Sequence, residues 1–278
     1  KPSVINSEFW YSNNSGAKRS LDKNYLRHAE EQGNLEIVTQ QNVTSIEEGP
    51  DGRYLVTSEE IDTNGSLLAT RKYVVKRLIL SAGSLGTSKL LTLAKGRDWL
   101  PKLNEEVGKN WGNNGDFFSS LTGLRQQVQP NRGGLVPVAI EDHHNPILPT
   151  TVECYADWSQ AGQHGMISSV GMSIPPAKGT FVYDKTIDDV VLTWPTTHPD
   201  ITKVTEAGTA TYNKLASSWG LTDHVHPVRS GLCETHSHVK NQSSSATTSP
   251  VTASVTAHPL GGVVLDQATD NIGQLKNY

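Results

Sequence analysis

The stretch Arg77-Leu78-Ile79-Leu80-Ser81-Ala82-Gly83-Ser84-Leu85-Gly86 decides the expected fold of this chain. Its apolar first half predicts a buried β-strand, and its glycines predict a turn. Residues 87–94 then place leucines at helical spacing, which predicts a helix directly after the turn. A strand, a glycine turn and a helix in this order leave free backbone N–H groups at the helix N-terminus. Anionic and polar cofactor groups tend to bind there.

The residues before this stretch predict one helix followed by antiparallel strands. The helix is expected to begin at Ser20, its N-cap, to carry an apolar stripe at helical spacing through Ala29, and to stop at Gly33-Asn34. Asp62-Thr63-Asn64-Gly65 is a strong signal for a hairpin turn. The expected strands are 35–39, 41–46, 54–58 and 67–75.

The residues after this stretch change character at about Phe117. From there to about Val191, short alternating runs broken by proline and glycine predict an antiparallel sheet, with strands at 151–156 and 179–183. Residues 202–219 predict a third helix, and the polar residues 232–249 predict an exposed loop. The expected fold class is therefore α+β.

Composition narrows the range of partners. The 278 residues include 24 basic and 28 acidic side chains without a basic run, so nucleic acid is not an expected partner. No window approaches the ~18 consecutive apolar residues of a membrane-spanning helix. The two cysteines, Cys154 and Cys233, are too few to form a disulfide framework, and we expect both to be unpaired.

The segment Val255-Thr256-Ala257-His258-Pro259-Leu260-Gly261-Gly262 places one imidazole on a short, stiff turn. Proline fixes its own φ, and the two glycines let a flat molecule approach the backbone. A neutral imidazole can both accept and donate a proton, which makes His258 a candidate acid or base.

Glu153 is a second candidate base, on an expected strand with Tyr155 and Trp158 close in sequence to exclude water. A carboxylate in apolar surroundings is a stronger proton acceptor than a solvated one. An exposed glutamate on an edge strand is the equally weighted alternative.

A group of histidines offers a rival interpretation as a zinc or copper site. It lies on a loop rich in serine and threonine, which lacks the fixed surroundings that tight metal sites need. We therefore expect a surface loop and no metal. The residues are His224, His226, Cys233, Glu234, His236 and His238.

Three segments together, 80–87, 179–184 and 255–262, resemble the glucose-methanol-choline (GMC) flavoprotein oxidoreductases, in particular their noncovalent-FAD cholesterol oxidases. Trp111-Gly112-Asn113-Asn114-Gly115-Asp116 also matches a stretch that passes near the flavin in that family. Ala257 and Val263 depart from the family's aromatic residue and cysteine, which implies a looser wall beside the flavin. The residues that the resemblance assigns to FAD binding are Val43, Gly83, Ser84, Gly86, Asn114, Gly115, Pro259 and Gly261.

The resemblance implies an FAD-dependent oxidase that converts a 3β-hydroxysteroid such as cholesterol to a 3-ketosteroid and reduces oxygen to hydrogen peroxide. His258 would orient or deprotonate the hydroxyl, and Glu153 would move a proton across the ring as a Δ5-to-Δ4 isomerase. A secreted or cell-surface protein with transient contact to a membrane surface is the matching expectation. The alternatives are another GMC alcohol oxidase or dehydrogenase, in which Glu153 has no catalytic part, and a noncatalytic sterol- or lipid-binding module.

The resemblance also implies a division into domains. A discontinuous FAD-binding domain with a central sheet would comprise 1–116 and 251–278, and an antiparallel-sheet substrate domain would comprise 117–250. The sequence lacks the family's G-x-G-x-x-G turn, which binds the diphosphate of FAD. We therefore expect a fragment of a longer oxidase, colourless and nearly inactive when purified as residues 1–278 alone.

Overall fold

The computed structural model divides the chain into two compact units. The α3 unit comprises Arg19–Gly112, Lys178–Trp194 and Pro259–Tyr278, and the α4 unit comprises Lys1–Lys18, Asn113–Ala177 and Pro195–His258. Each unit is named after its longest helix. The structure describes residues 5–8, 16–132, 138–158, 161–195, 198–218, 220, 225–227 and 256–278.

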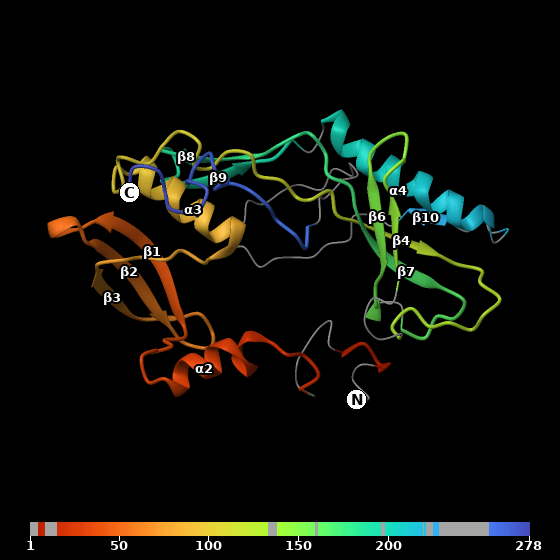
Figure 1. Cartoon of the computed structure of the whole chain (residues 1–278), viewed down its shortest axis with the longest axis horizontal. Coiled ribbons are helices and arrows are strands. Elements are labelled where there is room, and N and C mark those ends of the chain that lie inside the picture. Colours follow the sequence, from red (N-terminus) through yellow and green to blue (C-terminus); the bar gives the residue numbers. More distant parts are fainter. Residues whose placement is uncertain are drawn as a thin grey trace. The chain divides into compact units, whose positions relative to one another are not determined.

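An antiparallel sheet forms one layer of the α3 unit. Its strands β1 (Gln41–Glu48), β2 (Tyr54–Ile61) and β3 (Leu67–Val75) lie side by side in chain order (Figure 1). The Asp62 carboxylate accepts hydrogen bonds from the backbone N–H groups of Asn64 and Ser66, at 2.8 and 2.7 Å, and so closes the turn between β2 and β3. The predicted hairpin is confirmed.

The core of the α3 unit forms where helix α3 (Gly83–Gly96) packs against β1. Leu91 of the helix is 1% exposed and packs with Ile46 of β1 and with Leu100. The helix also contacts a hairpin of β8 (Thr180–Asp184) and β9 (Asp189–Thr193). The predicted helix over 87–94 is confirmed and begins four residues earlier. The strand predicted over 179–183 was expected in the sheet of the substrate domain, and that placement is wrong because β8 pairs with β9 in a separate two-stranded sheet.

Two predicted strands before α3 are not strands in the structure. Residues 78–81 have no regular structure and make no backbone hydrogen bond to the described residues, and Ile79 is 88% exposed. Residues 34–39 are likewise irregular. Strand propensity depends on pairing with a neighbouring strand, and neither segment has one in the part of the chain that the structure describes.

The predicted N-terminal helix is shorter than expected and begins later. A single 3-10 turn, η2 (Leu21–Lys23), precedes α2 (Tyr25–Glu31). Asn24 caps α2, its side-chain oxygen accepting from the Tyr25 N–H, whereas Ser20 caps no N–H group with its side chain. The expected apolar stripe is not buried, since Tyr25 is 78% exposed.

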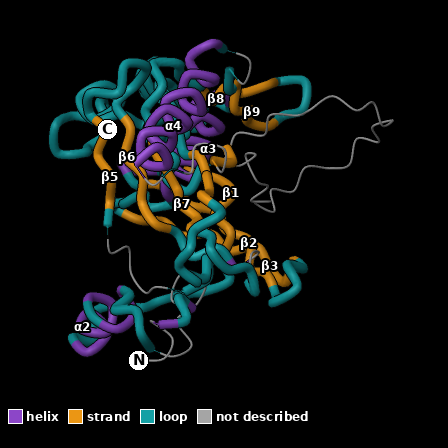
Figure 2. Tube along the Cα trace, turned by 90° about the vertical axis from the view of Figure 1, so that its right-hand side faces the viewer, coloured by secondary structure: helices purple, strands orange, loops and turns teal. Residues whose placement is uncertain are grey.

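A five-stranded antiparallel sheet and helix α4 (Pro199–Ser218) form the α4 unit, with the helix packed across β4, β6 and β7 (Figures 1 and 2). Gly208 of the helix allows close packing, because a Cβ there would lie 2.4 Å from the Phe117 ring. The predicted helix over 202–219 and the antiparallel sheet are confirmed. The strands, in the order of the sheet, are β10 (Val225–Pro227), β4 (Phe117–Leu121), β7 (Ile167–Met172), β6 (Thr150–Cys154) and β5 (Ala139–Asp142).

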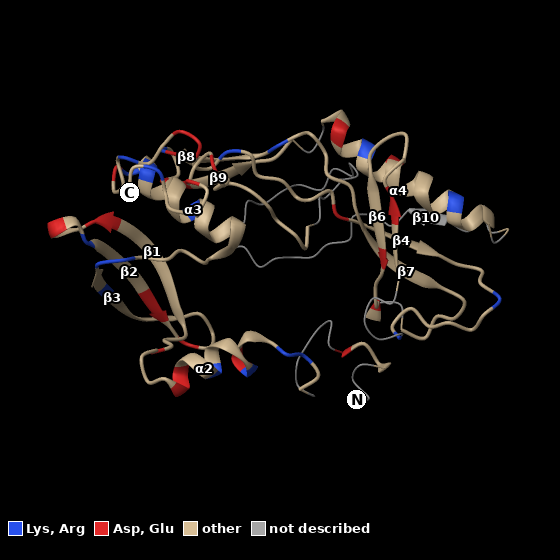
Figure 3. Cartoon of the chain, viewed as in Figure 1, with Lys and Arg blue, Asp and Glu red and all other residues tan. Residues whose placement is uncertain are grey.

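The fold class is α+β, as expected from the sequence. Basic and acidic side chains are interspersed, for example along α4 (Figure 3). Within the described residues, no helix is both long and apolar enough to cross a membrane. The division into FAD-binding and substrate-binding domains is a functional one and stays a prediction.

Candidate functional site

A tight turn in the α4 unit leads into β4 and places Asp116. The Asn113 side-chain oxygen accepts a hydrogen bond from the Gly115 N–H at 2.9 Å. Asn114 and Gly115 both have positive φ, +59° and +63°, which asparagine and glycine tolerate best. The chain therefore turns sharply and buries Asp116 directly before the first residue of the strand.

The Asp116 carboxylate collects hydrogen bonds from the segment that ends in His258. Its side chain is 1% exposed. One oxygen accepts from the backbone N–H groups of Ala257, at 2.5 Å, and of His258, at 3.1 Å, and from the Thr256 hydroxyl at 3.3 Å. The other accepts from the Asn114 amide at 3.3 Å. A buried carboxylate is tolerated only when donors surround it in this way.

The His258 ring is bound to the same carboxylate through one nitrogen. Nδ1 lies 3.0 and 3.1 Å from the two oxygens of Asp116. The side chain is 50% exposed, and Nε2 makes no hydrogen bond to any residue described. The arrangement can hold the ring at Nδ1 and leave Nε2 to exchange a proton with a bound molecule.

Glu153 lies on β6 beside Val170 of β7. Its side chain points away from the face on which Val152 packs against α4, because successive residues of a strand alternate in direction. It is half-buried. On the same face, the rings of Phe118 and Tyr155 lie 5.4 Å apart. The structure records no hydrogen bond between Glu153 and His258.

The N-terminus of α3 is open to a ligand. Ala82 occupies the N-cap position and has no side-chain oxygen to satisfy the first N–H groups of the helix. Gly83 has φ +71° and is exposed, and a Cβ there would meet no atom within 4 Å. The Ser84 hydroxyl donates to the Gly261 carbonyl at 3.0 Å. This end of the helix thus fits a polar or anionic group held by backbone N–H groups.

Several other residues assigned to FAD binding are explained by packing within their own unit. A Cβ on Gly115 would lie 1.9 Å from the Ser173 carbonyl oxygen, and one on Gly261 would lie 2.1 Å from that of Asn110. A Cβ on Gly86 would lie 2.9 Å from the Ala82 side chain. Val43 is 36% exposed on β1, next to an irregularity in its pairing with β2. Close packing therefore explains these glycines without a cofactor.

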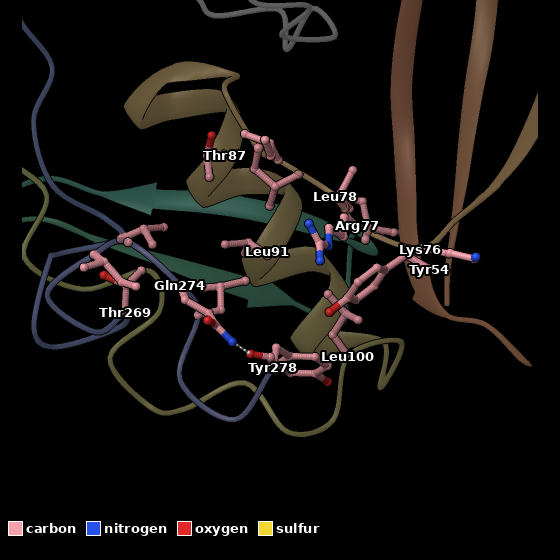
Figure 4. Close-up of a pocket in the computed structure, with 17 residues that line it drawn as sticks. Tyr54, Lys76, Arg77, Leu78, Thr87, Leu91, Leu100, Thr269, Gln274 and Tyr278 are labelled. Carbon is pink, nitrogen blue, oxygen red and sulfur yellow. Dashed lines mark hydrogen bonds between the residues drawn. The ribbon is translucent and has the colours of Figure 1, made fainter. Parts of the chain in front are cut away.

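The α3 unit contains a cavity of about 660 Å³ that the sequence did not reveal (Figure 4). Its walls are mainly apolar, with Lys76 and Arg77 on one side and Gln274 and Tyr278 on another. Burial is the main cause that raises the pKa of Tyr278 to about 12. None of the predicted site residues lines the cavity. The full lining is Ile46, Tyr54, Lys76, Arg77, Leu78, Ile79, Leu80, Thr87, Leu91, Leu100, Val263, Thr269, Ile272, Gly273, Gln274, Leu275 and Tyr278.

The histidine cluster of the rival metal interpretation falls almost entirely outside the described residues, so that interpretation is not tested. His226 contributes backbone to β10, and the remaining residues of that cluster, His224, Cys233, Glu234, His236 and His238, lie outside the described residues. Among the side chains that are described, no group of three or more histidine, cysteine or acidic residues could hold a metal ion. Cys154 is free, and burial raises the pKa of its thiol.

Comparison with known proteins finds a family match in the first part of the chain. Residues 6–111 match the family model of the GMC oxidoreductases. The chain is 26% identical over 140 residues to a cholesterol oxidase of Acinetobacter baumannii, and 30% identical over 139 residues to cholesterol oxidases of two Mycobacterium tuberculosis strains. These matches cover 49 to 50% of this chain. They span 23 to 25% of the relatives' length.

Proposed function

Because residues 6–111 match the GMC oxidoreductase family, we propose that this chain is part of a flavin-dependent oxidoreductase that oxidises an alcohol. The observation that carries the proposal is the imidazole of His258, which a buried carboxylate anchors at Nδ1 and whose side chain is half-exposed. Alcohol oxidation requires a group that takes the hydroxyl proton while a hydride leaves the carbinol carbon. A neutral imidazole performs that task at neutral pH.

FAD is the cofactor that the family match supports. The open N-terminus of α3, at Gly83 and Ser84, is the part of this chain that fits one of its polar groups. When bound, FAD would accept the hydride. The protein would hold the reacting groups in position and provide their electrostatic surroundings. The chain's own contribution to the chemistry is His258: its Nε2 accepts the proton of the substrate hydroxyl and later releases it to solvent.

A 3β-hydroxysteroid is the substrate that we propose within this class. The similarity to cholesterol oxidases supports it. Glu153 on β6, beside the aromatic pair of Phe118 and Tyr155, is the group that we propose to move a proton from C4 to C6 of the Δ5-ketone. Oxygen as the final electron acceptor, with release of hydrogen peroxide, completes the proposed reaction.

The test uses the full natural protein that contains these residues. Purification with FAD followed by assay on cholesterol and on short-chain alcohols distinguishes a steroid oxidase from another alcohol oxidoreductase. His258→Gln should reduce kcat by ~100-fold or more. His143→Gln is the matched control, because His143 pairs with Glu141 at 3.1 Å on an exposed surface and should leave kcat unchanged.

Two results would contradict the proposal. The protein could bind sterol while it neither retains FAD nor oxidises any alcohol, which would favour a binding module. Alternatively, His258→Gln could turn over at the wild-type rate. The isomerase step has its own test, since Glu153→Gln should accumulate the Δ5-ketone while its rate of alcohol oxidation stays close to that of the wild type.

A further inference from the structure

We infer that Asp116 is a positioning residue that fixes the tautomer of His258, with the proton on Nδ1 and the lone pair on Nε2. The catalytic role of Asp116 rests on the proposed function. The placement of the proton on Nδ1 rests on contacts within the α4 unit alone. No feature of the sequence around Asp116 pointed to this role, since 142 residues separate it from His258.

The partners of Asp116 show which form its carboxyl group takes. Apart from the ring, every group that contacts it is a donor: two backbone N–H groups, the Thr256 hydroxyl and the Asn114 amide. An ionised carboxylate is an acceptor only and has room for about four such bonds, whereas a protonated one would bring an O–H into this set of donors. The ionised form therefore matches the surroundings.

An acceptor at Asp116 determines where the His258 proton lies. Nδ1 is 3.0 and 3.1 Å from the two carboxylate oxygens, so a stable contact requires a hydrogen on Nδ1. In the neutral ring the second nitrogen then carries a lone pair. The side chain is 50% exposed and Nε2 bonds to no described residue, so this lone pair can accept a proton from a bound hydroxyl group.

The same carboxylate fixes where the ring stands. It accepts the backbone N–H groups of Ala257 and His258 as well as Nδ1–H. The backbone at residue 258 and the ring attached to it are thus held by one group. Pro259 follows directly and restricts the chain further. A ring tied at both points loses little rotational freedom when a substrate binds.

Asp116→Asn tests the effect of Asp116 on the His258 tautomer separately from its effect on the position of the ring. Its amide oxygen can still accept the two backbone N–H groups. Nδ1 lies 3.0 Å from the oxygen that accepts those N–H groups and 3.1 Å from the other, so the asparagine offers the ring one acceptor and one donor. The NH₂ donor pairs with a lone pair on Nδ1, so the preference for Nδ1–H should weaken in favour of Nε2–H. Asp270→Asn is the matched control, because Asp270 likewise accepts two backbone N–H groups, at 3.0 and 2.9 Å, and touches no histidine.

The experiment is long-range ¹H–¹⁵N NMR of the 278-residue chain with ¹⁵N-labelled histidine at pH 8. The chain has ten histidines, and the signals that vanish in His258→Gln identify residue 258. Wild type and Asp270→Asn should show mainly the Nδ1–H tautomer. Asp116→Asn should show a larger fraction of the Nε2–H tautomer than the wild type, with a chemical-shift pattern otherwise close to wild type.

The outcomes distinguish this inference from the proposed function. A wild-type ring in the Nε2–H form, or a tautomer unchanged by Asp116→Asn in a folded chain, overturns the inference whatever the activity. If the Nε2–H fraction rises in Asp116→Asn, the inference stands even when no alcohol is oxidised. In an active full-length protein, Asp116→Asn should lower kcat by ~10-fold or more with KM changed less than threefold, since the ring stays in place but carries a lone pair on Nε2 in a smaller fraction of molecules. An unchanged kcat would show that Asp116 has no part in catalysis.

Discussion

The Ser84 hydroxyl donates a hydrogen bond to the Gly261 carbonyl oxygen, 3.0 Å away and 177 residues later in the chain. The contact joins the N-terminus of α3 to the glycine turn that follows Pro259, within the α3 unit. Two segments that the sequence singled out separately thus form one local structure. Backbone hydrogen bonds between Gly112 and Leu260, both at 2.9 Å, hold the same turn.

Ser84→Ala should lower the free energy of unfolding by about 1 kcal/mol, because it removes one net hydrogen bond and leaves a carbonyl without its donor. Urea titration followed by far-UV circular dichroism measures the change. Ser81→Ala is the control, since Ser81 is exposed and donates no hydrogen bond to the described residues. Equal unfolding midpoints for the two variants would contradict the contact.

Gly115→Ala should destabilise the α4 unit by roughly 2 to 5 kcal/mol. Positive φ costs a residue with a Cβ about 1 to 2 kcal/mol, and the collision with the Ser173 carbonyl oxygen at 1.9 Å adds about 1 to 3 kcal/mol of overpacking. Gly162→Ala isolates the first contribution, because Gly162 has φ +92° and open space around it. If both variants lose the same free energy of unfolding, the contact with the Ser173 carbonyl oxygen does not destabilise Gly115→Ala, and the prediction is wrong.

Leu91→Ala should lower the free energy of unfolding by ~2 to 5 kcal/mol, the usual range for a leucine removed from a core. Leu91 is 1% exposed and packs with Ile46 and Leu100. Leu85→Ala on the same helix should change stability by less than about 0.5 kcal/mol, because Leu85 is 42% exposed. Thermal unfolding of the two variants provides the comparison.

Asp142 should make the α4 unit sensitive to acid. The Lys214 ammonium 2.7 Å away is the main cause that holds the pKa of Asp142 below its ordinary value of 3.8. The unfolded state therefore binds the proton first, so the stabilisation is present above about pH 4 and is lost as the pH falls through the folded-state pKa. Asp142→Asn should lack this pH-dependent stabilisation, so its free energy of unfolding should converge with that of the wild type near pH 2. A stability difference that is constant from pH 7 to pH 2 would contradict the ion pair.

The elements with local signals were predictable from the sequence. Asp62-Thr63-Asn64-Gly65 marks a turn by residues that bond their own backbone, and the leucines of α3 mark a helix by their spacing. The predicted strand over 77–83 failed for the opposite reason. Its apolar residues indicate pairing with a neighbour, and pairing is a property of two segments rather than one.

The candidate site was predictable only in part. His258 stood out because proline and two glycines follow it. Asp116 did not, since an aspartate after an Asn-Gly turn usually indicates nothing more than the turn. Its role depends on a contact with a segment 142 residues away, and no periodicity or spacing rule reaches that far. The cavity beside α3 escaped notice for the same reason, because its walls come from distant parts of the chain.

The most direct test of the central claim, that His258 takes the hydroxyl proton, is the rate of flavin reduction in the full natural protein mixed anaerobically with an alcohol substrate. His258→Gln should bind FAD as the wild type does and reduce it ~100-fold to 10,000-fold more slowly. Equal rates of flavin reduction in the two proteins would contradict the account.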